Sequence, residues 1–363
     1  MFCEYNRIMS ISSNNEIYSF GKCEYGSHGH SGPRRIKVPT LIKNIKNVKM
    51  ISFATFHTAY LTHNGEVYSS RYKHEIISYN PTIPNIFAPR KFDIPPCSQI
   101  SSGSDFTFCL TTNHSLYFFG NPKILSHANE FDFNTPQLVE TISNINYIVC
   151  GDQFCICQTL DDKYVSFGEN DKGQLGNGSI SDPIVPSMNY LDFPHNIIDI
   201  KCGYNHTLLL NERGYIYSFG SNTNGKLGLS KNDENVGIPT PTLIENIPEM
   251  KIIECGGDFS MCIDINNELW VCGNLSDFGC VIEFTKISQF LPQISNVIDI
   301  SSGGNILFVK TLDNKIYGLG GLLYYEHSFN LVQNDDYSIS NSFLDNDMWC
   351  SLISNSKKKS ARK

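Results

Sequence analysis

A repeated block restricts the possible folds of this chain more than any other feature of its sequence. Six blocks of 24 residues align without a gap, and successive blocks begin 47 to 53 residues apart. Residues 1–21 align as a seventh block that lacks its first three positions. A period of this length is typical of repeat architectures, in which each unit packs against its neighbours. The six full blocks are 48–71, 97–120, 145–168, 197–220, 250–273 and 297–320.

Each block contains three short apolar stretches separated by turn residues. The turns include "HNGE" and "NERG", in which Gly or Asn can adopt the positive φ that a tight hairpin needs. A fourth apolar stretch follows a proline at 39–42, 136–139 and 241–244. Four strands per unit predict the blade of a β-propeller.

The sequence therefore predicts an all-β fold, a seven-bladed propeller of four-stranded blades formed by residues 1–354. Closing the ring removes the exposed sheet edges of an open array. We expect the N- and C-terminal strands to share a blade, with 329–332 and 336–354 supplying what the first block lacks. Residues 355–363 are expected to be a basic, disordered tail.

The composition indicates a soluble intracellular protein. Apolar residues make up 40% of the chain and charged residues 18%, and no run approaches the roughly 18 apolar residues of a membrane span. The N-terminus shows no secretory signal pattern, so we expect a cytoplasmic location, with the nucleus also open. Seven of the 13 cysteines recur at two equivalent block positions, and most of the 13 are expected to be reduced core residues.

Glycines recur at one spacing after the third strand of three units. This Gly-rich segment reads "SFGENDKGQLGNGS" at 166–179 and "SFGSNTNGKLGLS" at 218–230. We expect these glycines to supply turn geometry and to let neighbouring blades approach closely. They are Gly21, Gly26, Gly29, Gly168, Gly173, Gly176, Gly220, Gly225 and Gly228.

With these segments aligned, the chain resembles the repeat of the regulator of chromosome condensation family across residues 1–354. The matching residues are "GYNHTLLLNERGYIYSFGSNTNGKLGL" and "VSFGENDKGQLGNG". The resemblance implies a seven-bladed propeller. It does not imply one activity, because the family includes guanine-nucleotide exchange factors for the small GTPase Ran, ubiquitin-ligase modules and adaptors.

Three aspartates follow the block glycine in the loop between the first and second strands. Asp152 matches the family's "G-D-x-H" loop, and Asp105 and Asp258 match "G-x-D-H", each with Phe in place of His. The resemblance implies that these residues face a GTPase, together with Tyr204 and Asn205 of the equivalent loop. Such carboxylates could attract a basic GTPase surface and compete with nucleotide phosphate for its P-loop lysine. The alternative is that they are solvated loop residues that bond turn amides.

Other chemistry is poorly supported by the sequence. His57 and His206 occupy a block position that accepts Phe elsewhere, which favours packing over catalysis. The segment 220–227 matches a phosphate loop except at Leu227, where a magnesium ligand is needed. We find no Ser/His/Asp set, metal constellation or cofactor fingerprint, so we predict no catalytic residue, cofactor or metal. Exchange activity stays open.

The charge distribution argues against nucleic acid as a partner. Residues 101–356 carry a net charge of −19, which repels nucleic acid and attracts basic protein surfaces. Basic clusters occur at 32–37, 43–49 and 357–363. We expect a monomer that binds other proteins.

Two functional hypotheses remain. The first is a propeller that binds a small GTPase, Ran-like or other, with possible nucleotide exchange. The second is a non-catalytic scaffold for another partner, cytoskeletal or from the ubiquitin pathway. A wedge-like protrusion on one face would favour exchange, whereas featureless loops would favour the scaffold. A kelch-type propeller is the weaker structural alternative, because Gly-Gly doublets follow the pattern only at 256–257 and 303–304.

Overall fold

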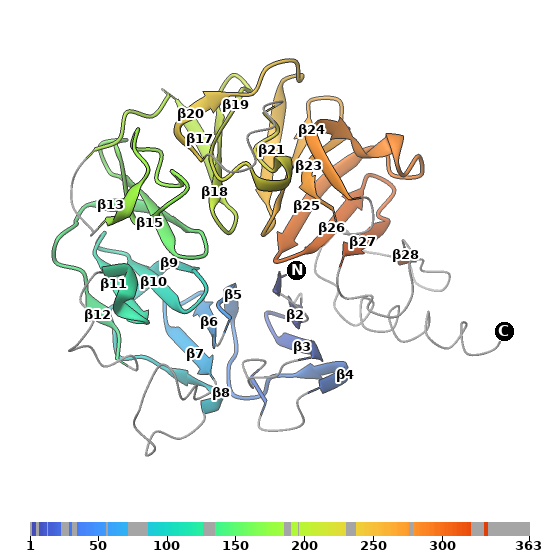
Figure 1. Cartoon of the computed structure of the whole chain (residues 1–363). Helices are drawn as coiled ribbons and strands as arrows, with labels where there is room; N and C mark the ends of the chain where they lie inside the picture. The colour runs from blue at the N-terminus through green and yellow to red at the C-terminus, as the bar shows by residue number, and fades with distance from the viewer. Residues whose placement is uncertain are drawn as a thin grey trace, which may run out of the picture.

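Seven four-stranded antiparallel sheets stand around a central axis as the blades of a ring (Figure 1). This architecture confirms the seven-bladed propeller that the repeat predicts. The computed structural model describes residues 2–4, 7–12, 14–22, 29–30, 35–55, 57–71, 86–125, 135–184, 190–194, 196–229, 237–275, 279–320 and 330–332.

Within every blade the strands follow one another in chain order. Blades one and two contain β1 (Phe2–Glu4), β2 (Arg7–Ile11), β3 (Ile17–Lys22), β4 (Arg35–Leu41), β5 (Val48–Phe53), β6 (His57–Thr62), β7 (Val67–Arg71) and β8 (Ile86–Lys91). Blades three and four contain β9 (Cys97–Ser102), β10 (Phe106–Thr111), β11 (Leu116–Gly120), β12 (Gln137–Leu138), β13 (Ile145–Cys150), β14 (Phe154–Thr159), β15 (Tyr164–Asn170) and β16 (Ser181–Ile184).

The remaining blades repeat the same pattern. Blades five and six contain β17 (Ile197–Cys202), β18 (His206–Asn211), β19 (Ile216–Gly220), β20 (Ile238–Leu243), β21 (Met250–Cys255), β22 (Phe259–Asp264), β23 (Leu269–Asn274) and β24 (Cys280–Lys286). Blade seven contains β25 (Val297–Gly303), β26 (Ile306–Thr311), β27 (Ile316–Gly320) and β28 (Asn330–Val332). Short 3₁₀ turns are η1 (Pro122–Leu125), η2 (Thr223–Gly225) and η4 (Ile287–Gln289).

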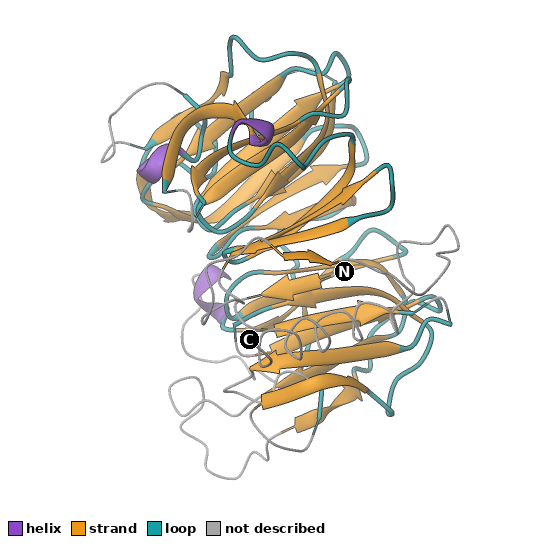
Figure 2. Ribbon diagram, turned by 90° about the vertical axis from the view of Figure 1, so that its right-hand side faces the viewer, coloured by secondary structure: helices purple, strands orange, loops and turns teal. Residues whose placement is uncertain are grey.

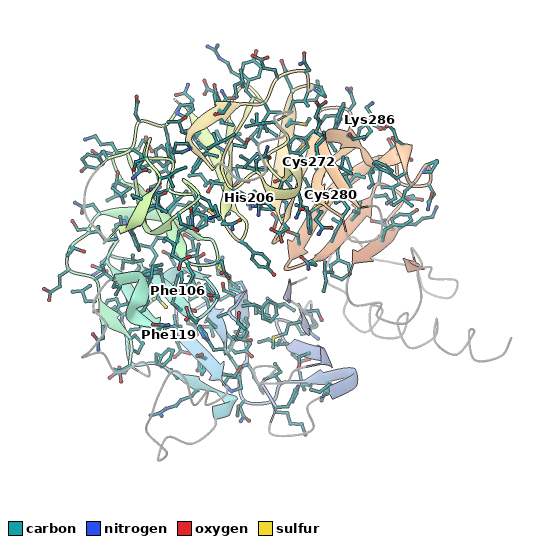
Figure 3. The ribbon with its side chains drawn as sticks, in the orientation of Figure 1. Phe106, Phe119, His206, Cys272, Cys280 and Lys286 are labelled. Atoms are coloured by element: carbon teal, nitrogen blue, oxygen red, sulfur yellow. The ribbon has the colours of Figure 1, made fainter. Side chains whose placement is uncertain are left out.

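The hydrophobic core lies between neighbouring blades. Every residue of β10 is buried, because each face of the blade packs against another blade. Phe106 and Phe108 pack toward blade four, whereas Phe119 belongs to the cluster shared with blade two (Figure 3). Phe108 meets Phe167 of blade four edge to face, with ring centroids 5.4 Å apart. Strands buried on both faces explain why the blocks read as apolar runs rather than as alternating patterns.

The predicted glycine roles are confirmed in the hairpin turns and, for close approach between blades, at Gly173 and Gly225. In the hairpin turns, Gly65 and Gly214 have φ of 80° and 79°. In the Gly-rich segments, a Cβ added at Gly173 would lie 2.6 Å from the Cα of Pro239 in blade five. A Cβ added at Gly225 would lie 2.4 Å from the next blade's backbone. The segments therefore pack directly onto the outer strand of the following blade.

The prediction of a shared closing blade is wrong. β1 pairs with β2 and completes blade one, so the first block supplies its own first strand. The segment expected to join blade one instead pairs as β28 with β27 in blade seven. The ring closes by packing, since β1 contacts both β5 and β25. Residues 336–354 and the tail 355–363 lie outside the described residues.

The ring has two faces, and the strands run between them (Figure 2). In an antiparallel blade, the loop between strands one and two lies on the same face as the connection from strand three to strand four. We call this the Gly-rich face. The hairpins between strands two and three, and the connections to the next blade, lie on the opposite face. We call this the hairpin face.

Candidate protein-binding face

The loops between first and second strands are joined by backbone hydrogen bonds around the Gly-rich face. Each loop donates its second amide to a carbonyl of the next blade's loop, which fixes the loops relative to one another. These hydrogen bonds form a chain in which each N–H donates to the carbonyl of the next residue named: Thr55, Ser104, Asp152, Tyr204, Gly257 and finally Gly304. The candidate residues, which come from blades three to six, therefore lie along one continuous backbone belt.

Asp105 and Asp152 come together at the border of blades three and four. The Asp105 carboxylate accepts hydrogen bonds from Asn121 Nδ2 at 2.7 Å and from Gln153 Nε2 at 3.1 Å. Burial raises the pKa of Asp152 to about 6, and the nearby Asp105 and Glu169 carboxylates add to the rise. We call Asp105, Asp152 and Glu169 the acidic cluster. It concentrates negative charge that a cationic side chain could neutralise.

Asp258 and Asn205 have a different task from the acidic cluster. Both accept hydrogen bonds from Lys226 Nζ, each at 2.6 Å. Only 2% of the Lys226 side chain is exposed, against 35% of the Asp258 side chain. Asp258 is therefore the counter-ion of a buried lysine between blades five and six.

Tyr204 takes part in inter-blade packing. A Cβ added at Gly257 would lie 2.3 Å from the Tyr204 ring, so the ring rests on the glycine of the next blade. The five predicted residues thus separate into a pair that adds to an acidic cluster, a pair that holds Lys226, and an aromatic residue packed across a blade border. None of these placements tests whether they bind a partner.

Sequence reasoning missed Glu169, Gln153 and Lys226 as parts of this face. A signal for Lys226 existed, because Gln174 fills the same repeat position in blade four and is buried there. A lysine in place of a buried glutamine needs a counter-charge, which the aspartate of the next block supplies. The same contacts occupy the lysine that the phosphate-loop interpretation would need, and Leu227 is fully buried.

The two repeat histidines pack between blades, as their exchange with Phe predicts. His57 Nε2 lies 2.6 Å from Thr107 Oγ1, and His206 Nε2 lies 3.0 Å from Ser260 Oγ, both in the following blade. The His206 ring rests on Gly203, where a Cβ would lie 2.1 Å away, and lies between blades five and six (Figure 3). Burial, helped by the positive charge of Lys226, lowers the pKa of His206 well below its ordinary value.

Most of the recurring cysteines among the described residues are also core residues, and Cys202 is half-buried. Cys109, Cys157 and Cys262 are fully buried, and Cys150 and Cys255 are buried at the ends of β13 and β21. Burial raises the pKa of the Cys262 thiol well above its ordinary value, so its reactive thiolate form is disfavoured. Within the described ranges, no three His, Cys, Asp or Glu side chains are arranged to hold a metal ion. The described residues also contain no helix long and apolar enough to cross a membrane.

Comparison with known proteins bears on the repeat directly. Residues 166–210 and 213–263 match the family model described as the regulator of chromosome condensation (RCC1) repeat, and residues 197–226 match a second model of that description. Residues 166–263 carry RCC1 repeats. The matched residues run from the third strand of blade four to the second strand of blade six, and they include two Gly-rich segments and the Lys226 site.

The relatives that match this chain in sequence differ widely in length. The protein RCC2 homolog of Xenopus laevis is 40% identical over 208 residues, which are 47% of this chain and 39% of that protein. E3 ubiquitin-protein ligase HERC2 of Homo sapiens is 25% identical over 291 residues, 75% of this chain and 6% of that protein. The chain therefore spans well under half the length of either relative.

A solved propeller supports the fold independently. Prp20p from Saccharomyces cerevisiae superposes with a TM-score of 0.73 at 19% identity, covering 99% of this chain and 85% of that chain. At this identity the likeness establishes the fold alone.

Proposed function

We propose that this propeller of RCC1 repeats binds a small GTPase through its Gly-rich face, with Asp105 and Asp152 at the centre of the contact. The acidic cluster carries the proposal. Asp105 and Asp152 lie in the loops that the backbone belt joins, and the ionised form of Asp152 is disfavoured by burial and by the neighbouring carboxylates. A partner's Lys or Arg would relieve that repulsion, which makes a basic surface the favoured ligand.

Two likenesses support the same direction. The resemblance to the exchange-factor repeats implies that aspartates of these loops face Ran. Prp20p, which shares the fold, is described by its binding to Gsp1p and histones. Both partners belong to relatives, so for this chain a GTPase contact is our proposal.

Nucleotide exchange is the stronger form of this proposal. A carboxylate that competes with phosphate for the GTPase's P-loop lysine would favour the nucleotide-free state. Within the described part of the chain, every strand of a sheet belongs to one of the blades, and no described hairpin projects as a wedge. This observation favours binding without exchange, which is the scaffold hypothesis. The likeness to HERC2 keeps a ubiquitin-pathway partner among the scaffold alternatives.

The test measures binding and exchange separately. Ran and a panel of Rho- and Rab-type GTPases are immobilised in the nucleotide-free and GDP-bound forms, and binding of the chain is recorded. Release of a fluorescent guanine nucleotide is then followed with and without the chain. We expect Asp105→Asn and Asp152→Asn each to weaken binding about tenfold, the value of one partly buried charge contact. Asp258→Asn does not test the contact alone, because it also removes the counter-ion of Lys226 and so changes the stability of the fold.

A matched control comes from the hairpin face. Asp161 is exposed and pairs with Lys163 at 2.8 Å, so Asp161→Asn removes one carboxylate from the opposite side. We expect no change in GTPase binding for this variant. Loss of binding in Asp161→Asn equal to that in the acidic-cluster variants would mean non-specific charge attraction. No binding to any GTPase by the folded chain would leave the scaffold hypothesis.

A further inference from the structure

A pocket opens on the hairpin face, at the border of blades one and two. Its volume is about 330 Å³, at the lower end of the range of ligand sites. One wall is the connection between β4 and β5, and the other is the hairpin between β6 and β7. The lining residues are Lys43, Asn44, Ile45, Lys46, Asn47, Thr62, Asn64, Glu66 and Tyr68.

The two walls are held together by the backbone. The His63 N–H donates to the Asn47 carbonyl at 2.9 Å, which ties the hairpin to the connection. Asn47 turns the connection with φ of 57°, and the Gly65 N–H closes the hairpin on Thr62. Ile45 is buried beneath the connection and anchors it. The pocket is therefore a built feature of the fold.

The charge of the pocket is positive. Lys43 and Lys46 are exposed, and the described contacts include no ion pair for either. Glu66 is the carboxylate among the lining residues, and it is already neutralised by Lys91 at 2.6 Å and by a hydrogen bond from the Tyr68 hydroxyl at 3.1 Å. Two ammonium groups and several side-chain amides thus remain available to an anion.

This charge is specific to one blade and is not a property of the repeat. The place of Lys43, five residues before the first strand of a block, is taken by acidic residues before three other blocks. The place of Lys46, two residues before the strand, is taken by Ser or Pro before four other blocks. The acidic equivalents of Lys43 are Glu140, Asp192 and Glu245.

We propose that this pocket binds a carboxylate side chain of an acidic peptide segment from a protein partner. The two lysines and the Asn side chains match a carboxylate in charge and hydrogen bonding. A long polyanion such as nucleic acid fits less well, because farther around this face it would meet Glu140, Asp192 and Glu245, the acidic equivalents of Lys43. The site lies on the face opposite the acidic cluster, so it does not depend on the proposed GTPase contact.

The test uses two labelled eight-residue peptides and fluorescence anisotropy. One peptide alternates Glu and Ser, and the other alternates Gln and Ser. The full chain is expected to bind the Glu peptide and not the Gln peptide. The double variant Lys43→Glu, Lys46→Glu should weaken binding at least tenfold. The control Lys251→Glu, an exposed lysine of blade six on the same face, should change it less than twofold.

Three results would overturn the proposal. Equal binding of the two peptides would remove the role of the carboxylate. Equal weakening by Lys251→Glu would indicate diffuse charge attraction in place of a pocket. Tighter binding of an oligothymidine probe, lost in the Lys43→Glu, Lys46→Glu variant, would assign the site to nucleic acid. GTPase binding measured on the same variants reports the other face, so the two proposals can fail separately.

Discussion

The buried ion pair between Lys226 and Asp258 makes an asymmetric prediction about stability. Removing the aspartate leaves a lysine that is only 2% exposed without its counter-charge. Removing the lysine leaves an aspartate whose side chain is 35% exposed, so water can solvate it. The two changes break the same 2.6 Å contact, yet they should differ in cost.

The magnitude follows from these exposures. Stripping a buried charge of its partner costs about 3–5 kcal/mol. Since Lys226 keeps its 2.6 Å bond to Asn205, we expect Asp258→Asn to cost about 3 kcal/mol. Lys226→Met keeps the side-chain volume and leaves a partly hydrated carboxylate, so we expect about 1 kcal/mol. Lys226→Gln, which restores the residue that blade four carries, should be close to Lys226→Met.

Urea unfolding at pH 7, followed by fluorescence and circular dichroism together, measures these costs. The double variant Lys226→Met, Asp258→Asn should be more stable than Asp258→Asn alone, because no unpaired buried charge is left. Equal costs for the two single variants would refute the reasoning. So would a double variant whose cost equals the sum of the singles.

Three further predictions concern pH and backbone geometry. The fold lowers the pKa of His206, so on acidification the unfolded chain takes up this proton before the folded chain does. Part of the free energy of unfolding that is present above about pH 6.5 should therefore be lost as the pH falls below that value. His206→Phe should remove this contribution to the pH dependence of the urea midpoint. The pKa of Asp152 is raised to about 6, so its cost to stability appears as pH rises from about 4 to 6. Asp152→Asn should therefore stabilise the chain by about 1 kcal/mol at pH 7, after discounting for exposure, and not below pH 4. Gly225 and Gly279 have nearly equal φ of 77° and 76°, so replacing either by Ala causes similar backbone strain. Only the Cβ of Gly225→Ala would lie 2.4 Å from the next blade. The melting temperature of Gly225→Ala should therefore fall by several degrees more than that of Gly279→Ala.

The sequence predicted the number of blades, the four strands of each blade and the hairpin turns because these depend on local pattern. Each block carries its own turn chemistry, such as Gly65 and Gly214, and its own buried strand. Ring closure depends instead on which distant strands pair. The first block seemed incomplete, yet the three residues of β1 suffice as a first strand. A fragment this short gives no periodic signal, so its pairing could not be read from the chain.

The sequence predicted where the candidate residues lie but not which contacts they make. Alignment placed Asp105, Asp152 and Asp258 in equivalent loops, and the structure confirms those loops. Their partners come from other blades or from the segment after the third strand. Gln153 reaches back to Asp105, and Lys226 reaches across to Asp258. Such contacts join residues up to 48 positions apart, and a single sequence does not specify them.

Deviations from the repeat point to function in this chain more directly than the repeat itself does. Positions that agree between blades, such as the buried second strands, satisfy the packing that every blade needs. Lys43 stands where three other blades place a carboxylate, and no packing requirement explains the change because its side chain is exposed. Lys226 also departs from its repeat equivalent, but it is buried and paired, so its change is structural. Exposure therefore separates the two lysines: the buried one stabilises a blade border, and the exposed one is available to a partner.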